Sequence, residues 1–288
     1  MAKLADAYHE LDSEIVLIVG DRVEAFAAAS AAHISGRIVA HVHGGDRALG
    51  QIDDALRHAI TKLAHIHFPA TKQSARRILK LGEDRWRVHQ VGSPGIDGII
   101  GEAVLGHGLN PRSYVLLVLH PIDADEKMEY RRARLTLQAI QRAGGRSVVI
   151  IYPNNDPGSD GIIRAWEVSK PSNSITIHQN VARPTFLGLM RDAAVLVGNS
   201  SSGIIEATSF GTPVVDIGPR QAGRERGPNV VNVPYSARAI EQAVRRAISR
   251  PRPLKRNVYG GQGTARRITA ILANVKIDDR LRRKLIAY

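Results

Sequence analysis

Polar side chains follow five short apolar segments of this sequence, each at the point where the segment ends. In chain order they are Asp21 with Arg22, Asp46, His120, Asn154, and Asn199 with the serines after it. Strand ends and helix N-termini favour Asp, Asn and Ser in any protein, so no single instance identifies a site. Their recurrence at five ends predicts one rim where charged and hydrogen-bonding groups meet.

A run of serines, Ser200, Ser201 and Ser202, stands between the apolar segment 195–197 and the predicted helix IIEATSF. The unpaired N–H groups and partial positive charge of a helix N-terminus attract phosphate, and hydroxyl groups add further donors. Gly203 would let a ligand approach the backbone closely. The alternative is that one serine caps the helix and the others have no special role.

Two charged residues accompany the serine run. Glu206 has the chemistry to accept hydrogen bonds from the sugar hydroxyls of a nucleotide, or it complements the helix dipole. Arg220 follows the next apolar segment. The sequence leaves three alternatives for Arg220: a partner of a diphosphate, a partner of Glu206, or a surface arginine.

Carboxylates near two other segment ends have the chemistry of general acids and bases. Asp21, Asp53 and Asp54 would each contribute about 10²- to 10⁴-fold in rate in that role. Asp53 and Asp54 also suit the first turn of a predicted helix, with Arg57 one turn further on. For His120, the alternative to a site residue is a hydrogen-bonded histidine at a strand end.

Several other chemistries are not expected. No G-x-S-x-G elbow accompanies the serines, which argues against a hydrolase nucleophile. The chain has no cysteine and hence no disulfide or thiolate metal site. Two histidine pairs have the alternation that places both side chains on one strand face: His41 with His43, and His65 with His67. Because neither pair has a third ligand at a recognisable spacing, we expect no metal.

Apolar and amphipathic segments alternate along two stretches of the chain. The first runs from residue 15 to residue 100 and the second from 114 to 218, and a Gly-, Asn- and Pro-containing linker lies at 101–113. This alternation predicts parallel α/β sheets. Two such halves would hold a ligand in the cleft between them, at the carboxyl ends of the strands.

The charge is unevenly distributed. The formal charge is +13, and residues 241–288 contain thirteen Lys or Arg against three Asp or Glu. The remaining residues, 1–240, are close to neutral. The whole chain has only four Phe, which argues against a nucleic-acid surface with stacked bases. We expect a solvated basic tail, with an anionic-surface binder as the alternative. Without an apolar span or signal-peptide core, the chain is expected to be cytoplasmic and not in a membrane.

Five longer segments carry a family resemblance: GDRVEAFAAASAA, HVHGGD…GQIDDALRHAITKLAHIHFPAT, LGEDRWRVHQVGSPGID, YPNND and GNSSSGIIEATSFGTPVVDIGPRQAGRERG. They resemble the UDP-N-acetylglucosamine 2-epimerase family, most closely its hydrolysing branch in sialic-acid-type sugar biosynthesis. The likeness runs from about residue 15 to about residue 272. IDDALRHAITKLAH and GNSSSGIIEA are its most specific parts.

The resemblance implies two Rossmann-like domains of the glycosyltransferase-B type. They would be residues 1–104, N-terminally truncated, and residues 105–265, which bind the nucleotide; a basic helix at 266–288 would cross back to the first domain. The implied reaction eliminates UDP from UDP-N-acetylglucosamine and hydrates the resulting glycal with inversion at C2, giving N-acetylmannosamine. The family implies a UDP-sugar substrate, a homodimer or other homo-oligomer, and no cofactor.

By position, the resemblance implies that Asp21 and Asp53 are the acid/base carboxylates. The other two predicted catalytic residues are His43, in a position where several members carry a catalytic glutamate, and His120, which would lie near the phosphates. The predicted substrate-binding residues are Arg22, Arg57, Asn154, Ser200, Ser201, Gly203, Glu206 and Arg220.

The sequence also departs from the family pattern. It lacks the usual N-terminal strand and Gly-Thr/Ser-Arg loop, and Asp46 stands where a glutamate commonly follows the two glycines. The alternatives are therefore a non-hydrolysing 2-epimerase, a glycosyltransferase of the same fold, and an inactive truncated homologue.

Overall fold

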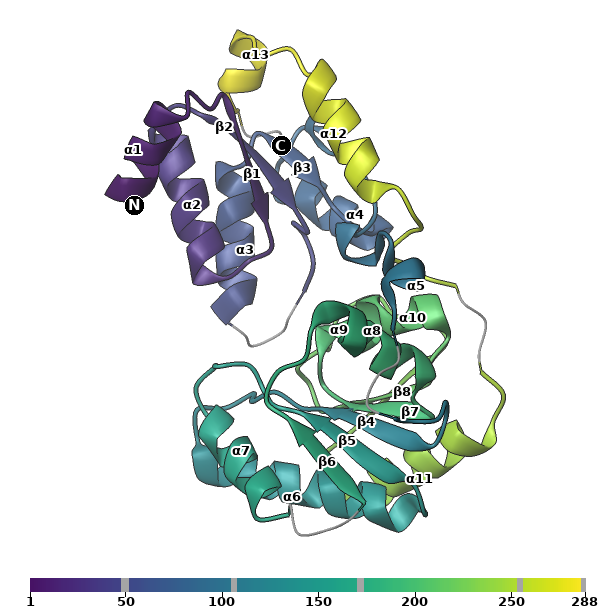
Figure 1. The fold of residues 1–288 in the computed structure, drawn as a ribbon. Helices are drawn as coiled ribbons and strands as arrows, with labels where there is room; N and C mark the ends of the chain where they lie inside the picture. The colour runs from purple at the N-terminus through teal and green to yellow at the C-terminus, as the bar shows by residue number, and fades with distance from the viewer. Residues whose placement is uncertain (48–51, 105–107, 170–173, 253–255, 286–288) are drawn as a thin grey trace. The chain divides into compact units, whose positions relative to one another are not determined.

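The chain folds into two compact units. The computed structural model describes residues 1–47, 52–104, 108–169, 174–252 and 256–285 (Figure 1). Unit 1 comprises Met1–Asp97, Gly223–Glu225 and Val258–Tyr288, and unit 2 comprises Gly98–Ala222 and Arg226–Asn257.

Unit 1 contains a three-stranded parallel sheet in the order β1-β2-β3. Its strands are β1 (Ile15–Val19), β2 (Ile38–Val42) and β3 (Ile66–Phe68). Its helices are α1 (Ala2–Glu10), α2 (Val23–Ile34), α3 (Ile52–Leu63), α4 (Lys72–Lys80), α12 (Thr264–Asn274) and α13 (Asp279–Arg282), with 3₁₀ turns at Arg85–Arg87 and Pro94–Ile96.

Both faces of this sheet are covered, as is usual for parallel sheets. Successive residues of β2 point to opposite sides. Val39 packs with Ala29 of α2 and Ile60 of α3 on one side. Ile38 belongs to a second cluster with Ile268 of α12 on the other. The C-terminal helices thus complete the core of unit 1.

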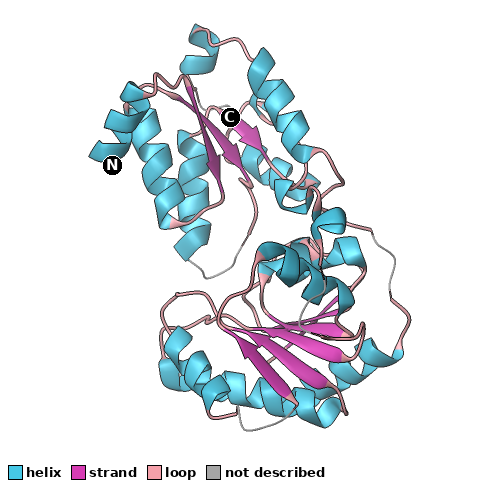
Figure 2. Ribbon diagram, in the orientation of Figure 1, coloured by secondary structure: helices cyan, strands magenta, loops and turns pink. Residues whose placement is uncertain are grey.

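Unit 2 contains a six-stranded parallel sheet, whose strands are magenta in Figure 2. The strand order is β6-β5-β4-β7-β8-β9. Its strands are β4 (Tyr114–Val118), β5 (Ser147–Ile151), β6 (Ile175–His178), β7 (Val195–Gly198), β8 (Val214–Ile217) and β9 (Val230–Val233). The direction in which strands are added reverses between β4 and β7. In open α/β sheets a ligand binds at such a switch point, beyond the carboxyl ends of the strands.

Helices cover both faces of this sheet as well. Val115 and Val195 pack with Leu137 of α6 and Ile240 of α11 on one face. The helices of unit 2 are α5 (Ile99–Glu102), α6 (Glu126–Ala143), α7 (Ser159–Glu167), α8 (Arg183–Asp192), α9 (Ser201–Ile205), α10 (Ala207–Phe210) and α11 (Ala237–Ser249). The expected parallel α/β architecture is confirmed.

The observed boundaries differ from those that the sequence predicted, 1–104, 105–265 and 266–288. Residues 98–104 belong to unit 2, where the N–H of Val104 donates to the carbonyl of Pro184 at 3.0 Å. The predicted break itself falls at residues 105–107, outside the described part of the chain. Residues 258–265 belong to unit 1, where Ser93 N–H donates to Tyr259 O at 2.8 Å.

The basic tail is not one solvated helix. Residues 241–288 contain the end of α11, which belongs to unit 2, and then α12 and α13 of unit 1, which are separated by extended backbone at Val275. Leu281 is buried in the core of unit 1, and Asp278 caps α13 by accepting from Leu281 N–H at 2.9 Å. Apolar residues on an amphipathic pattern therefore dock this segment in spite of its charge. Among the described residues, no helix combines the length and apolar character needed to cross a bilayer.

Candidate functional site

A buried arginine of unit 1 forms ion pairs with two carboxylates. Arg57 lies on α3 and is only 1% exposed. Its Nη1 donates to Asp54 Oδ1 at 2.8 Å and to the carbonyl of Asp46 at 3.0 Å, and its Nη2 donates to the carboxylate of Asp21. A buried guanidinium requires such compensation. The structure therefore brings together the end of β1, which leads to Asp21, and the first turn of α3.

Two further predicted residues lie beside this group along the chain. Asp53 is half-buried in the first turn of α3, next to Asp54. Arg22 is different, because its side chain is 55% exposed and lies 3.9 Å from Glu24 at the start of α2. Arg22 is thus accessible to an anion.

His43 belongs to a hydrogen-bonded chain of buried groups. Its Nδ1 lies 3.3 Å from Asp46 Oδ2 and its Nε2 lies 3.0 Å from Ser93 Oγ. Because a carboxylate only accepts, Nδ1 donates to Asp46, and in the neutral ring Nε2 then accepts from Ser93. Asp46 Oδ1 also accepts from Ser74 Oγ at 2.6 Å. His43 is therefore held at both ring nitrogens.

Asp46 is ionised within this chain. Burial alone would raise the pKa of its carboxyl group, but His43, Arg224 and Ser74 together hold that pKa below its ordinary value. The backbone approaches closely here, since a Cβ on Gly45 (φ +75°) would lie 2.2 Å from the carbonyl of Ser74. His43 itself has φ +67°, a conformation that is uncommon for a residue with a side chain.

The histidine pairs do not share strand faces as the alternation predicted. β2 ends at Val42, so His43 has left the strand, whereas His41 is fully buried with Nε2 at 2.9 Å from the carbonyl of Gly20. Burial lowers the pKa of His41 to about 3, and nearby positive groups add to this effect. His67 bonds to Glu83 at 3.0 Å. These rings therefore have structural partners.

In unit 2, one side chain joins the ends of the two strands at the switch point. Asn199 follows β7 and His120 follows β4. The Asn199 Oδ1 accepts from the N–H of His120 at 2.7 Å, and its Nδ2 donates to the carbonyl of His120 at 2.8 Å. This pairing fixes the backbone where a ligand of a doubly wound sheet would bind.

The His120 ring is neutral. Burial and the positive charge of Arg220 lower its pKa and Asp156 raises it, with a net pKa of about 4. Its Nδ1 accepts from the backbone N–H of Asn154 at 3.0 Å. The ring proton is therefore on Nε2, which makes His120 a neutral hydrogen-bond donor. Such a donor suits a phosphate oxygen.

Arg220 lies at the same strand ends. Its Nη1 donates to the carbonyl of Asn199 at 3.4 Å and its Nη2 lies 3.7 Å from Asp156. Gln221 donates to the same carbonyl at 2.8 Å. The Nδ2 of Asn154 bonds to Asp156. The predicted residues Asn154 and Arg220 thus meet around one carboxylate of unit 2.

The serine run starts a shorter helix than expected. α9 begins at Ser201 and has five residues, and the predicted helix IIEATSF is divided between α9 and α10. Ser200 is its N-cap, with Oγ 3.4 Å from the N–H of Ser202 and 2.8 Å from Ser202 Oγ. So short a helix has a small dipole, and the hydroxyl groups of Ser200 and Ser201 remain the better donors.

Gly203 serves packing. It is buried, and a Cβ there would lie 3.1 Å from Val214 and 3.2 Å from Leu196. The absence of a side chain lets α9 rest on the strands β7 and β8, and the close approach of a ligand to its backbone stays a prediction.

Glu206 lies between α9 and α10. It is the N-cap residue of α10, but its side chain makes no capping hydrogen bond. Its carboxylate accepts from Arg183 Nη1 at 3.1 Å, and its side chain is 14% exposed. Burial raises its pKa, and Arg183 opposes the shift. A carboxylate in this position has the chemistry to accept hydrogen bonds from sugar hydroxyls.

Asp54 and Asn199 were named from the ends of the apolar segments, but the family resemblance assigned no role to either. Sequence reasoning missed two other residues of these groups, Ser93 and Arg183. Ser93 precedes a Pro-Gly turn, which is a weak signal. Nothing in the sequence distinguished Arg183 from other arginines.

Comparison with known proteins identifies the family. The model of the UDP-N-acetylglucosamine 2-epimerase family matches residues 1–273. The chain belongs to this family. It is 34% identical over 286 residues to the UDP-N,N'-diacetylbacillosamine 2-epimerase (hydrolyzing) of Legionella pneumophila, covering 96% of this chain and 74% of that protein. It is 32% identical over 256 residues to the UDP-N-acetylglucosamine 2-epimerase of Neisseria meningitidis, covering 86% of this chain and 66% of that one.

The 2-epimerase fold is also found by structural comparison. A UDP-GlcNAc 2-epimerase from Neisseria meningitidis, solved bound to UDP-GlcNAc, matches with a TM-score of 0.79 at 18% identity. The match covers 95% of this chain and 80% of that structure. The family resemblance and the glycosyltransferase-B type of fold predicted from the sequence are confirmed.

Proposed function

We propose that this chain acts as a hydrolysing UDP-N-acetylglucosamine 2-epimerase. The observation that carries the proposal is the 34% identity over 286 residues to a 2-epimerase whose name specifies hydrolysis. The chain spans 74% of the Legionella relative and 66% of the Neisseria relative, so the activity of the whole protein is part of the proposal.

Unit 1 is assigned the proton transfers. A carboxylate removes the C2 proton, the C1–C2 double bond forms, and the bond from C1 to the diphosphate oxygen breaks to release UDP. Water then adds its hydroxyl group to C1, and a proton is delivered to C2 on the opposite face, which gives N-acetylmannosamine. We assign these transfers to Asp21 and Asp53, with Arg57 holding Asp21 in place.

The roles of His43 and Arg22 follow from their surroundings. His43 keeps the Asp46 carboxylate oriented and ionised, so its catalytic contribution is exerted through Asp46. Arg22, the most exposed of the predicted residues of unit 1, supplies positive charge for the anionic substrate.

Unit 2 is assigned the nucleotide. The neutral His120 ring and the hydroxyl groups of Ser200 and Ser201 donate to the diphosphate, which becomes a better leaving group as its developing charge is stabilised. Arg220 adds positive charge at the same strand ends. Glu206 accepts from the ribose hydroxyl groups. The buried Oδ1 of Asn154 lies among these groups and has no hydrogen-bond partner in the described structure.

The test is incubation of the purified chain with UDP-N-acetylglucosamine in D₂O, followed by NMR. We expect free UDP and N-acetylmannosamine with deuterium at C2. Retained UDP-N-acetylmannosamine would indicate the non-hydrolysing reaction, and sugar transfer to an acceptor without C2 deuterium would indicate a glycosyltransferase. Nucleotide binding without turnover of any UDP-sugar would overturn the proposal and indicate an inactive homologue.

A second substrate follows from the Legionella relative, whose name specifies UDP-N,N'-diacetylbacillosamine. The same elimination and hydration apply, because this sugar also has a 2-acetamido group. Comparing kcat/KM for the two UDP-sugars decides which one the chain uses.

A further inference from the structure

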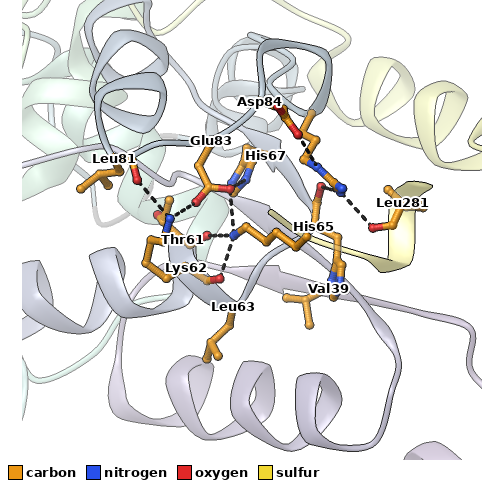
Figure 3. A network of polar contacts seen from close by, with 12 residues as sticks. Val39, Thr61, Lys62, Leu63, His65, His67, Leu81, Glu83, Asp84 and Leu281 are labelled. Carbon is orange, nitrogen blue, oxygen red and sulfur yellow. Dashed lines mark hydrogen bonds and ion pairs between the residues drawn. The ribbon is translucent and has the colours of Figure 1, made fainter. Parts of the chain in front are cut away.

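The C-terminal segment caps the helix that carries the candidate catalytic carboxylates. The last carbonyls of a helix have no partner within the helix. At the end of α3, Lys284 Nζ donates to the carbonyls of Thr61 at 2.9 Å and Lys62 at 2.7 Å (Figure 3). His33 Nδ1 lies 2.9 Å from the carbonyl of Leu63. Lys284 is 222 residues from Lys62 in sequence, so this cap depends on tertiary structure.

The ammonium group of Lys284 is also bound to a buried carboxylate. Its Nζ lies 2.8 Å from Glu83 Oε2, and Lys62 Nζ lies 2.7 Å from Oε1 of the same residue. His67 completes the group at 3.0 Å (Figure 3). Burial lowers the pKa of Lys284 to about 8, which Glu83 opposes, so the ammonium form predominates at neutral pH. A positive charge at the carboxyl end of a helix is favourable.

The segment that contains Lys284 is itself fixed to unit 1. Arg87 is buried and donates to the carbonyls of Arg280 at 2.7 Å and Leu281 at 2.9 Å. The Leu281 side chain is 1% exposed. The Trp86 ring has the guanidinium groups of Arg87 and Arg280 at 4.2 and 4.4 Å. Lys284 therefore reaches α3 from a firmly placed backbone.

The opposite end of α3 carries Asp53 and Asp54, and Arg57 lies near the middle of the helix. A helix of twelve residues is about 18 Å long and moves largely as one body, so a constraint at its last turn also limits its first turn. We propose that Lys284 is a positioning residue, which sets the placement of the carboxylates on α3 through the carboxyl end of that helix. The catalytic part of this inference rests on the proposed function, whereas the structural part does not.

Three substitutions in the full chain test the proposal: Lys284→Met, which removes the charge and the donors; Lys284→Arg, which retains both; and Arg283→Met as the matched control. The Arg283 side chain is 79% exposed and pairs with Asp279 of α13, so it is not part of the cap on α3. Lys284→Gln is the fallback if Lys284→Met does not fold.

The first measurement is amide hydrogen exchange in α3, which requires no substrate. Lys284→Met is expected to speed exchange of residues 57–64 about tenfold, because the cap and its charge are lost. Lys284→Arg and Arg283→Met should exchange as the parent does. Unchanged exchange in Lys284→Met would overturn the proposal, whether or not the chain is an epimerase.

The second measurement separates positioning from general stability. With UDP-N-acetylglucosamine, Lys284→Met should lower kcat about tenfold with KM within about twofold of the parent, because the affected carboxylates act in the chemical step. Lys284→Arg should restore most of kcat. A rise in KM with unchanged kcat, or no rescue by arginine, would contradict a positioning role. A parent without turnover would refute the proposed function and leave the exchange result to decide the placement of α3.

Discussion

The side-chain amide of Asn199 pairs with both backbone groups of His120, through bonds of 2.7 and 2.8 Å. These residues follow β7 and β4, the two strands between which the order of the unit 2 sheet reverses. Asn199 therefore continues the contact between the strands beyond their last backbone hydrogen bond. It also fixes the backbone that presents the neutral His120 ring.

Replacement of Asn199 by alanine should destabilise unit 2. The substitution leaves a backbone donor and a backbone acceptor of His120 without partners, at a cost of about 1–3 kcal/mol. We expect a lower urea midpoint and weaker UDP binding by calorimetry. Asn274→Ala is the control, because that exposed amide bonds within its own helix, α12, to the carbonyl of Ala270. Equal losses in both variants would argue against a special role for the Asn199 pairing.

Replacement of Asp53 by asparagine should abolish most turnover and leave UDP binding intact. If Asp53 transfers a proton, its loss lowers kcat by about 10²- to 10⁴-fold. Asp12→Asn is the control, since that side chain is 98% exposed. Steady-state kinetics and calorimetry with UDP separate the two effects. A kcat within twofold of the parent would remove Asp53 from the mechanism.

The sheets and the strand-end groups could be predicted from the sequence because both are local signals. Asn199 and the serines directly follow an apolar segment, and α3 begins at the two aspartates. Their partners could not be predicted. Arg57 bonds to Asp21, 36 residues away, and the burial of that guanidinium depends on the packing of α3 against β2.

In the basic tail, contacts between residues far apart in sequence were even less predictable. Charge counting favoured a solvated helix, because Lys and Arg far outnumber Asp and Glu in the segment. Leu281 and Lys284 nevertheless bond to Arg87 and Thr61, which precede them in sequence by 194 and 223 residues. The number of charges in a segment says little about which of its side chains are buried, since a single well-placed carboxylate such as Glu83 compensates for a buried lysine.

Acidification should destabilise the chain through His120. The pKa of this ring is lowered from 6.5 to about 4 by burial. Above pH 6.5 both the folded and the unfolded chain hold it neutral. Between pH 6.5 and 4 only the unfolded chain takes up the proton, so the free energy of unfolding falls, by on the order of 3 kcal/mol when the shift is complete.

Urea unfolding of the parent and of His120→Asn between pH 7 and pH 4.5 tests this expectation. Asparagine retains an acceptor for the N–H of Asn154 but does not titrate, so the variant should lose less stability across the window. The same slope for both proteins would mean that His120 is not held neutral by the fold.

Replacement of Glu206 by glutamine should weaken recognition of the ribose. A hydrogen bond to a charged group contributes about 1.5–3 kcal/mol, so UDP affinity should fall about 10- to 100-fold. The parent should prefer UDP over 2′,3′-dideoxy-UDP, and Glu206→Gln should lose most of that preference. Glu102→Gln is a matched control, because Glu102 also faces Arg183, at 3.8 Å, and is more exposed. If Glu102→Gln reduces the preference equally, the effect acts through Arg183 and Glu206 does not contact the ribose. Calorimetric titration of both nucleotides into the three proteins decides between these outcomes.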